Sequence, residues 1–248
     1  MAELNTLRAA ALIAAIGAGT AAQSQDFQHD WEGFYAGAHL DGTAYSIGVV
    51  DLNNSFLAQP PDFTTLLFQG GVTGGYNYQL ENNLLISAEL DWSSVLEISE
   101  FVSSNANETT GVQYDLNMEN VLQLRGRAGF TQGNALGYIT AGVAQAQTSF
   151  ETFAVNTGSN QVDCESSTCA SNTEPLLGLT FGAGVDWAFR ENWVGRIEFQ
   201  HMAFENIEAP VRDSDDEPLC NTVDTGQCAV SYSPSSTSIR VGVSYMFE

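Results

Sequence analysis

The sequence predicts an all-β fold, an eight-stranded antiparallel up-and-down β-barrel that spans a membrane. Two observations predict it: segments in which apolar and polar residues alternate, and tight turns that alternate with long polar loops between these segments. A period of two is typical of a β-strand. One face of residues 178–189 is apolar and comprises Leu179, Phe181, Ala183, Val185, Trp187 and Phe189. Because the opposite face holds glycine, threonine and aspartate, we expect the apolar face outside, against lipid.

The strands are expected, in chain order, at residues 34–46, 66–80, 84–99, 114–130, 135–150, 176–189, 193–204 and 237–247. Short links rich in asparagine and glycine are typical of hairpin turns. Glu81-Asn82-Asn83 is such a link after the second strand, Gly133-Asn134 ends the one after the fourth, and Arg190-Glu191-Asn192 follows the sixth.

The first, third, fifth and seventh strands are followed instead by long polar connections. These connections cover residues 47–64, 100–113, 151–174 and 205–235. In barrels of the bacterial outer membrane the short turns face the periplasm and the long loops face outward. We therefore expect four long extracellular loops, with both chain ends on the periplasmic side.

The fifth strand departs from a simple alternation. Ile139, Ala141 and Val143 face outward, but the same phase then carries Gln145 and Gln147 into lipid. A β-bulge near Ala144 would shift the phase of the strand, and we expect one there.

Aromatic residues gather at the strand ends nearest the short turns. They comprise Trp31, Phe34, Tyr76, Tyr78, Phe130, Tyr138, Trp187, Phe189, Trp193, Tyr245 and Phe247. A soluble β-sandwich would bury its aromatics near strand centres, so this placement favours an interfacial girdle in a membrane. A second, looser belt is expected to include Tyr45, Phe68, Tyr114, Phe150 and Phe204.

Charged residues fall on the inward phase of the strands, and the interior of an eight-stranded barrel is just wide enough for side chains to fill. The expected lumen charge network comprises Asp41, Glu89, Asp91, Arg125, Arg127, Asp186, Arg196, Glu198 and Arg240, with His39 on the same phase. If Asp91 lies opposite Arg125, antiparallel pairing puts Glu89 opposite Arg127.

Arginine suits such a network because its planar fork binds carboxylates through two hydrogen bonds. An unpaired charge away from water costs several kcal/mol, so a connected polar plug is predicted. We favour a structural salt-bridge core over proton or ion conduction, and both over catalysis.

The charge of the whole chain is strongly negative. Thirty acidic residues face seven arginines and no lysine, giving a net charge of −23. Such a surface repels nucleic acids, so no nucleic-acid partner is expected. It suits divalent cations, or a salty habitat in which charge keeps the surface hydrated. The acidic run Asp213, Asp215, Asp216 and Glu217 could bind Ca²⁺ through oxygen ligands. It lacks the spacing and glycine of an EF-hand, so a solvated acidic loop is favoured and no metal or cofactor is expected.

The four cysteines lie in two of the expected loops, as Cys164 with Cys169 and Cys220 with Cys228. An exported protein meets an oxidising compartment, which favours disulfides, and pairing within each loop is preferred to a bridge between loops. Metal binding is the alternative, but the spacings and the lack of a nearby histidine fit zinc poorly.

The first 22 residues are typical of a secretory signal. Arg8 precedes an apolar run at residues 9–18, and Thr20-Ala21-Ala22 provides small residues for cleavage. The apolar run is too short to span a bilayer as a helix. We expect residues 1–22 to form a cleavable signal peptide and residues 23–248 to form a single barrel domain.

Several short motifs carry a resemblance to a known family. They are Trp31-Glu32-Gly33-Phe34-Tyr35-Ala36-Gly37, Gly74-Gly75-Tyr76-Asn77-Tyr78, Arg125-Gly126-Arg127-Ala128-Gly129, Tyr138-Ile139-Thr140-Ala141-Gly142-Val143, Gly182-Ala183-Gly184-Val185-Asp186-Trp187 and Val241-Gly242-Val243-Ser244-Tyr245-Met246-Phe247. In their order, these motifs resemble the small outer-membrane β-barrels related to the membrane domain of outer-membrane protein A. The branch they resemble is that of alphaproteobacterial surface antigens of the opacity type.

The resemblance implies an integral outer-membrane protein surrounded by lipid and lipopolysaccharide. It also implies that Tyr245 and Phe247 form a terminal-strand signal for the barrel-insertion machinery. The family usually ends on the aromatic residue itself, whereas Glu248 follows Phe247 here.

These observations predict a structural, surface-exposed outer-membrane protein. Its lumen is plugged, and its acidic, disulfide-bearing loops serve surface interaction or envelope integrity. The alternative is a narrow porin-like channel for small solutes or ions. An enzyme is not expected, because His29, His39 and His201 lack a serine and an acid at suggestive positions. A soluble barrel of the lipocalin kind would place apolar residues inside and polar residues outside, the reverse of the pattern here. A monomer is favoured over an oligomer.

Overall fold

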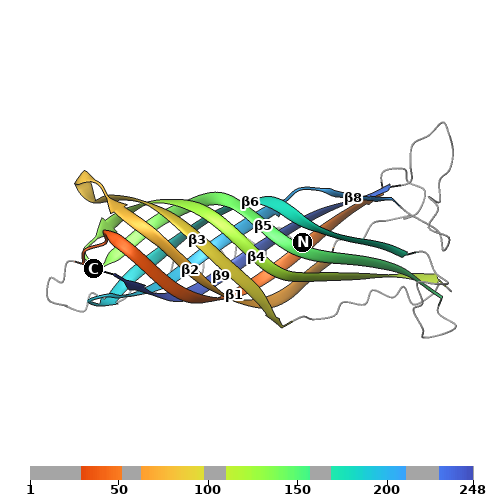
Figure 1. Ribbon diagram of the computed structural model, residues 1–248, viewed down its shortest axis with the longest axis horizontal. Helices are drawn as coiled ribbons and strands as arrows, with labels where there is room; N and C mark the ends of the chain where they lie inside the picture. The colour runs from red at the N-terminus through yellow and green to blue at the C-terminus, as the bar shows by residue number, and fades with distance from the viewer. Residues whose placement is uncertain (1–28, 52–62, 98–109, 157–168, 211–228, 248) are drawn as a thin grey trace, which may run out of the picture.

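The computed structural model describes residues 29–51, 63–97, 110–156, 169–210 and 229–247, and almost all of them form strands (Figure 1). The elements are β1 (Gly33–Asp51), β2 (Phe63–Gln79), the 3-10 turn η2 (Glu81–Asn83), β3 (Leu84–Glu97), β4 (Thr110–Gln132), β5 (Ala135–Asn156), β6 (Cys169–Arg190), β7 (Trp193–Phe204), β8 (Ile207–Pro210) and β9 (Ala229–Met246).

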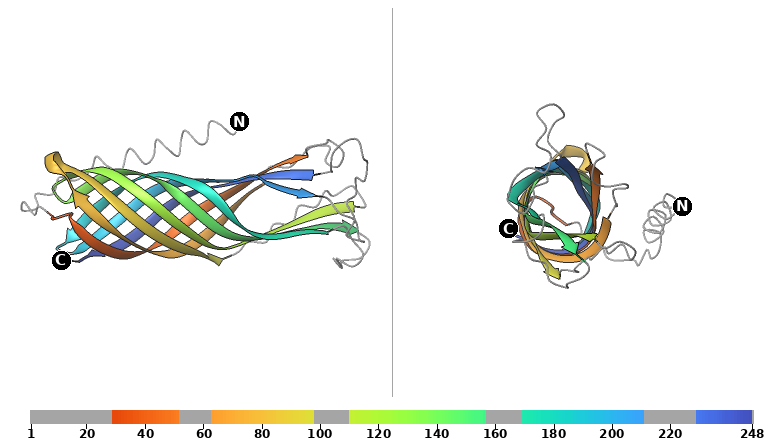
Figure 2. Two further views of the ribbon diagram at one scale, coloured as in Figure 1. Left: turned by 45° about the horizontal axis from the view of Figure 1, so that its top comes forward. Right: turned by 90° about the vertical axis from the view of Figure 1, so that its right-hand side faces the viewer.

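The strands form one closed antiparallel sheet. Each strand from β1 to β6 pairs with the next in sequence, β7 pairs with β9, and β9 pairs back with β1. The short β8 continues the line of β7 along the same edge of β9, so the barrel has eight strand positions around its circumference. The end view in Figure 2 shows the closed ring. The predicted fold, an eight-stranded up-and-down barrel, is confirmed.

The strands are tilted because the pairing is staggered around the barrel. A ladder of paired residues that starts at Ala36 on β1 and passes through every strand to Ser235 on β9 returns to β1 at Ser46. Stagger and tilt are linked in any closed barrel, and the oblique strands are evident in Figure 1.

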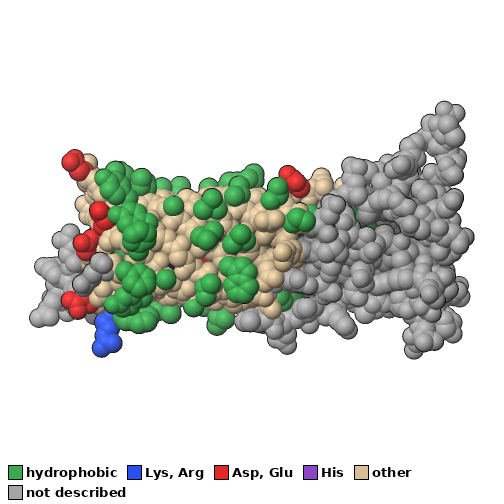
Figure 3. All heavy atoms as spheres, viewed as in Figure 1, with side chains coloured by type: hydrophobic (Ala, Val, Ile, Leu, Met, Phe, Trp, Pro, Cys, Tyr) green, Lys and Arg blue, Asp and Glu red, His purple; other side chains and the backbone are tan. Residues whose placement is uncertain are grey.

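The two phases of the strands face as the sequence predicts. Outward residues are largely exposed, for example Phe34 at 66%, Leu90 at 54% and Trp187 at 57%, whereas the inward Asp91 has no exposed surface. Apolar side chains are spread over the face of the wall that Figure 3 shows. Among the described residues, none forms a helix with the length and hydropathy of a membrane span.

Several strands are longer than predicted at the end away from the tight turns. β4 begins at Thr110 rather than 114, β5 ends at Asn156 rather than 150, β6 begins at Cys169 and β9 at Ala229. The short β8 was not predicted. Apolar alternation is imposed by contact with lipid, whereas backbone pairing needs no such pattern. The strands therefore continue past the residues whose pattern reveals them.

The tight turns are held to one another by asparagine side chains. The amide of Asn83 donates to the carbonyl of Thr131 at 3.2 Å, that of Asn134 to Ala188 at 3.3 Å and that of Asn192 to Met246 at 3.1 Å. Gly133 adopts a φ of +62° in its turn, as a two-residue hairpin link requires. Each turn is thereby linked to the end of the neighbouring strand in the barrel.

The bulge expected near Ala144 is wrong. β5 pairs with β6 in one unbroken register across its length, and the irregularity lies in β4 instead, between Met118 and Asn120. Gln145 and Gln147 stay on the exposed face, at the loop-side end of the wall. The phase of β5 thus continues, and the polar residues mark where its apolar surface ends.

Two members of the predicted aromatic girdle face the lumen instead. Trp31 is 1% exposed and Tyr138 is 5% exposed, whereas the other nine residues of that set lie on the outer wall. Tyr138 alternates with the outward Ile139, and Trp31 lies before β1, where its ring nitrogen donates to the carbonyl of Gly133 at 3.3 Å. Their height along the barrel was right and their face was wrong.

The second, looser belt is largely wrong as well. Tyr45 and Phe204 are buried inside the barrel, whereas Phe68 is 62% exposed on the outer wall. Tyr114 and Phe150 belong to β4 and β5, but their side chains lie outside what the structure describes.

A cation on the outer wall should destabilise the barrel. We expect Ala183→Arg, at mid-height of the apolar wall, to lower the free energy of unfolding by about 2–4 kcal/mol. Glu191→Arg in an exposed turn should change it little. Urea titration in phospholipid vesicles, read by heat-dependent gel migration, measures both variants, and equal stability of the two would contradict the orientation of the wall.

Candidate functional site

The lumen is filled by three layers of side chains. At the end near the tight turns lies a turn-side apolar layer, composed of Trp31, Tyr35, Leu85, Leu136, Tyr138, Ala188, Val194 and Met246. At the opposite end lies a loop-side apolar layer, composed of Tyr45, Leu67, Val121, Ala144, Ala146, Leu176, Met202 and Phe204. A charged layer occupies the space between them.

Glu89 is the centre of the lower half of the charged layer, the half next to the tight turns. It contacts Arg125, accepts a hydrogen bond from Arg196 at 2.6 Å and lies 3.6 Å from Arg127. The hydroxyl of Tyr35 donates to its second oxygen at 2.7 Å. One carboxylate from β3 therefore joins arginines from β4 and β7.

Two further carboxylates complete this half. Arg125 donates to Glu198 at 2.5 Å, and the hydroxyl of Tyr138 donates to the other oxygen of Glu198 at 2.6 Å. Asp186 accepts hydrogen bonds from Arg127 at 2.5 Å and from two nitrogens of Arg196 at 3.0 and 3.2 Å. The bidentate geometry fixes the guanidinium of Arg196 as well as neutralising it.

Arg240 is the centre of the upper half of the charged layer, the half next to the loop side. It donates to both oxygens of Asp41, at 2.8 and 2.9 Å, and to both oxygens of Asp91, at 2.9 and 3.1 Å. His39 lies between the same two acids, with Nδ1 3.1 Å from Asp41 and Nε2 2.9 Å from Asp91. Gln123 also donates to Asp91, at 3.2 Å, and connects the charges to the polar groups above.

The charges of the layer almost cancel. Four arginines face five carboxylates, and the ring of His39 is within hydrogen-bonding distance of two of those carboxylates. A ring that carries a proton on each nitrogen would donate to both acids and would bring the sum to zero. His39 is therefore a member of the network, where the sequence suggested only a satisfied lumen or rim residue.

All nine residues of the expected charge network lie inside the barrel, and each contacts an opposite charge. The expected pairing of β3 with β4 is wrong by two residues. Glu89 lies opposite Arg125, Asp91 opposite Gln123, and Arg127 opposite Ser87. β3 and β4 are joined at the loop side, so no tight turn fixes their register. An acid lies opposite Arg125 in either alignment, so charge pairing does not distinguish the two.

Sequence reasoning missed the two lumen tyrosines. Tyr35 and Tyr138 donate to Glu89 and Glu198, and the guanidinium carbon of Arg127 lies 3.8 Å from the ring centroid of Tyr138. This distance is typical of a cation–π contact. Their parity was the available signal, because each shares the inward phase of its strand.

The turn-side end of the lumen is covered by residues that precede β1. The ring of His29 packs edge-on against Trp31, with 4.7 Å between centroids, and both side chains are buried. Burial lowers the pKa of His29, because the charged imidazolium loses its hydration there. The chain thus folds back beneath the lumen before entering the barrel wall.

Other expected site residues fall outside the described part of the chain. Cys164, Cys220, Cys228, Asp213, Asp215, Asp216 and Glu217 do so, and of Cys169 only the backbone, at the start of β6, is described. Within the described ranges, no group of three or more His, Cys, Asp or Glu side chains is arranged to hold a metal ion.

Tyr245 and Phe247 lie on the outer wall near the turn-side rim. The two rings contact each other at 5.3 Å, and Tyr245 also contacts Trp193 at 5.3 Å. They form part of the aromatic girdle.

An apolar exterior around an interior that holds buried salt bridges defines an integral β-barrel of the outer-membrane class. The chain belongs to the family described as outer membrane protein beta-barrel domain, which matches residues 9–247. It is therefore a protein of the outer membrane.

The relatives that the chain resembles are named as immunogenic proteins of that membrane. It is 27% identical over 187 residues to the 31 kDa outer-membrane immunogenic protein of Brucella melitensis, which covers 75% of this chain and 69% of the relative. It is 23% identical over 220 residues to the 25 kDa outer-membrane immunogenic protein of Brucella canis, which covers 89% and 81%. Among solved structures, the outer membrane protein OprG from Pseudomonas aeruginosa covers 90% of this chain and 100% of its own, with 11% identity and a TM-score of 0.48.

Removing the charge of Glu89 should lower the free energy of unfolding by more than the loss of its hydrogen bonds alone would. Glu89→Gln keeps the shape but leaves buried arginines short of a counter-charge, and breaking such a buried pair costs about 3–5 kcal/mol. The free energy of unfolding in vesicles measures the effect, with Glu81→Gln in the exposed turn as the matched control. A loss of less than about 1 kcal/mol would place the charges in contact with water.

The corrected register has its own test. A double-mutant cycle on Asp91→Asn and Arg240→Gln should give a coupling energy near the upper end of the 0.5–3 kcal/mol range for contacting residues. The cycle on Asp91→Asn and Arg125→Gln should give a clearly smaller value, since Arg125 contacts Glu89 and Glu198 instead. The reverse order would restore the register expected from the sequence.

Proposed function

We propose that the protein is a non-conducting outer-membrane anchor that presents acidic loops at the cell surface. The observation that carries this proposal is the layered filling of the lumen. Water and ions would have to pass two apolar layers and a salt-bridge network between them. Each guanidinium in that network is held by carboxylates from other strands, so no single side chain can swing aside without leaving a buried charge unpaired.

The loop side of the barrel carries most of the unbalanced negative charge of the chain. Of the seven arginines, four lie in the lumen, Arg190 lies at a tight turn and Arg8 lies in the expected signal, so Arg212 is the one cation left for the loop side. The loop side is therefore strongly acidic, which suits divalent cations or basic partners. Both Brucella relatives are named as immunogenic, which supports surface exposure of the corresponding loops.

Further roles are proposed for the two ends of the chain and for the acidic run of one loop. Residues 1–22 would direct export and be removed, and Tyr245 with Phe247 would be read by the barrel-insertion machinery. The acidic residues Asp213, Asp215, Asp216 and Glu217 would remain solvated or bind divalent cations loosely.

The alternative, a narrow porin-like channel, differs in one measurable property. The refolded protein in planar bilayers should show no discrete conductance steps. A variant with one large side chain removed from each apolar layer and a charge-balanced pair removed between them, Trp31→Ala, Glu89→Ala, Arg196→Ala and Met202→Ala, should conduct if it migrates as a folded barrel. Reproducible steps from the unaltered protein would favour the channel.

Disulfides should stiffen two of the presented loops. Peptide mapping of the non-reduced protein by mass spectrometry should recover Cys164 linked to Cys169 and Cys220 linked to Cys228. Peptides that link the two loops, or four free thiols in protein from the oxidising cell envelope, would refute this pairing.

A further inference from the structure

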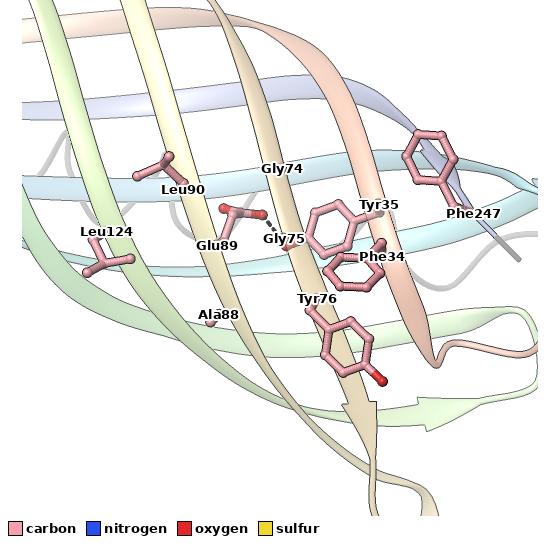
Figure 4. A pocket seen from close by; sticks show the side chains of 10 residues that line it. All are labelled: Phe34, Tyr35, Gly74, Gly75, Tyr76, Ala88, Glu89, Leu90, Leu124 and Phe247. Carbon is pink, nitrogen blue, oxygen red and sulfur yellow. Dashed lines mark hydrogen bonds between the residues drawn. The ribbon is translucent and has the colours of Figure 1, made fainter.

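A groove runs across the outer wall over β1, β2 and β3, near the turn-side rim. It has a volume of about 480 Å³. Figure 4 shows it between the rings of Phe34, Tyr76 and Phe247 on one side and the side chains of Leu90 and Leu124 on the other. These five side chains are 37–66% exposed, so the groove opens onto the membrane-facing surface.

The floor of the groove is made by residues with little or no side chain. Gly74 and Ala88 both face outward at this point. A Cβ atom added to Gly74 would meet only the carbonyl of Tyr35, at 3.6 Å, so the space above this glycine is open. Phe34 and Tyr76 pack edge-to-face at 4.7 Å and form a firm wall at the rim.

The walls and floor accept hydrocarbon and little else. The lining that faces outward is apolar, and Glu89 and Tyr35 lie behind the floor on the lumen side, where they bond to each other. Because the groove lies at the aromatic girdle on the side of the tight turns, it faces the periplasmic leaflet of the membrane. The neighbours available there are the acyl chains of that leaflet.

In lipid there is no hydrophobic gain from burying apolar surface, so retention depends on packing. An acyl chain on a flat wall is contacted along one side. A chain in this groove is contacted by its floor and both walls, and dispersion energy grows with the number of contacting atoms. An acyl chain in the groove therefore has more contacting atoms around it than one on a flat stretch of wall.

We propose that this groove binds one acyl chain of a phospholipid of the periplasmic leaflet and holds it as an annular lipid in a fixed place. The ring edges of Phe34, Tyr76 and Phe247 lie at the depth of the glycerol region, and the chain extends from there toward Leu90 and Leu124. The site is independent of whether the lumen conducts.

Photo-crosslinking in bilayers tests the proposal. The full-length protein is refolded in phosphatidylethanolamine and phosphatidylglycerol that contain a phosphatidylethanolamine with a diazirine in one acyl chain. After illumination, mass spectrometry maps the labelled residues. We expect labelling of the groove residues to exceed that of Val185 and Ile197, outward residues on the other side of the barrel, by about threefold, because the groove contacts the chain on three sides and a flat wall on one.

Two substitutions fill the groove and one serves as control. Gly74→Phe should reduce groove labelling to the level of the flat wall, and Ala88→Phe should do the same if Gly74→Phe fails to fold. Gly137→Phe also places a ring on the outer wall, at a position with open space, and should leave groove labelling unchanged. Heat-dependent gel migration confirms folding of each variant. Uniform labelling around the barrel would overturn the proposal, and so would crosslinks between protein copies at Leu90 or Leu124, which would make a second copy the occupant.

Discussion

The lumen depends on one constraint: each charge within it must be paired, because apolar layers above and below keep water away. This constraint explains why four arginines and five carboxylates from six strands converge on shared contacts rather than forming separate pairs. Glu89 serves three arginines and Asp186 serves two, so loss of one partner disturbs several others. The network therefore links strands that do not pair through their backbones, such as β1 with β3 and β3 with β7.

A charged interior is not the cheapest way to fill a barrel. Replacing buried ion pairs by apolar residues of similar volume is often neutral or stabilising. An apolar lumen would, however, make both faces of every strand apolar, and a strand of this kind becomes a continuous hydrophobic run. About 20 such residues would qualify as a membrane-spanning helix and would stop the chain on its way to the outer membrane. Glu89, Asp91, Arg125 and Arg127 place charges within β3 and β4, so neither strand is a continuous hydrophobic run.

The sequence was sufficient for some features and not for others, for physical reasons. Alternation is a local property, so the lumen position of Asp41, Arg196 or Arg240 could be read from neighbouring residues. Register between β3 and β4 is a property of two segments joined through residues 98–109, and no local pattern distinguishes Glu89 from Asp91 as the partner of Arg125. Height along the barrel placed Trp31 and Tyr138 at the turn-side end, but only parity or the path of the chain before β1 decides which face a residue occupies. The extra length of β4 to β6 could not be predicted, since backbone pairing beyond the membrane needs no apolar pattern.

The layered lumen also gives a physical meaning to two of the glycine-rich motifs. Tyr35 and Tyr138 reach the carboxylates by lying flat across a neighbouring strand, and each lies over a glycine. A Cβ atom at Gly75 would come within 2.6 Å of the Tyr35 hydroxyl, and one at Gly184 would come within 2.6 Å of the Tyr138 hydroxyl. Any side chain at either position would displace the tyrosine from its acid, so Glu89 or Glu198 would lose its tyrosine donor and keep only its arginine donors. Gly75 and Gly184 thus support the charge network, although they carry no charge and make no hydrogen bond through a side chain.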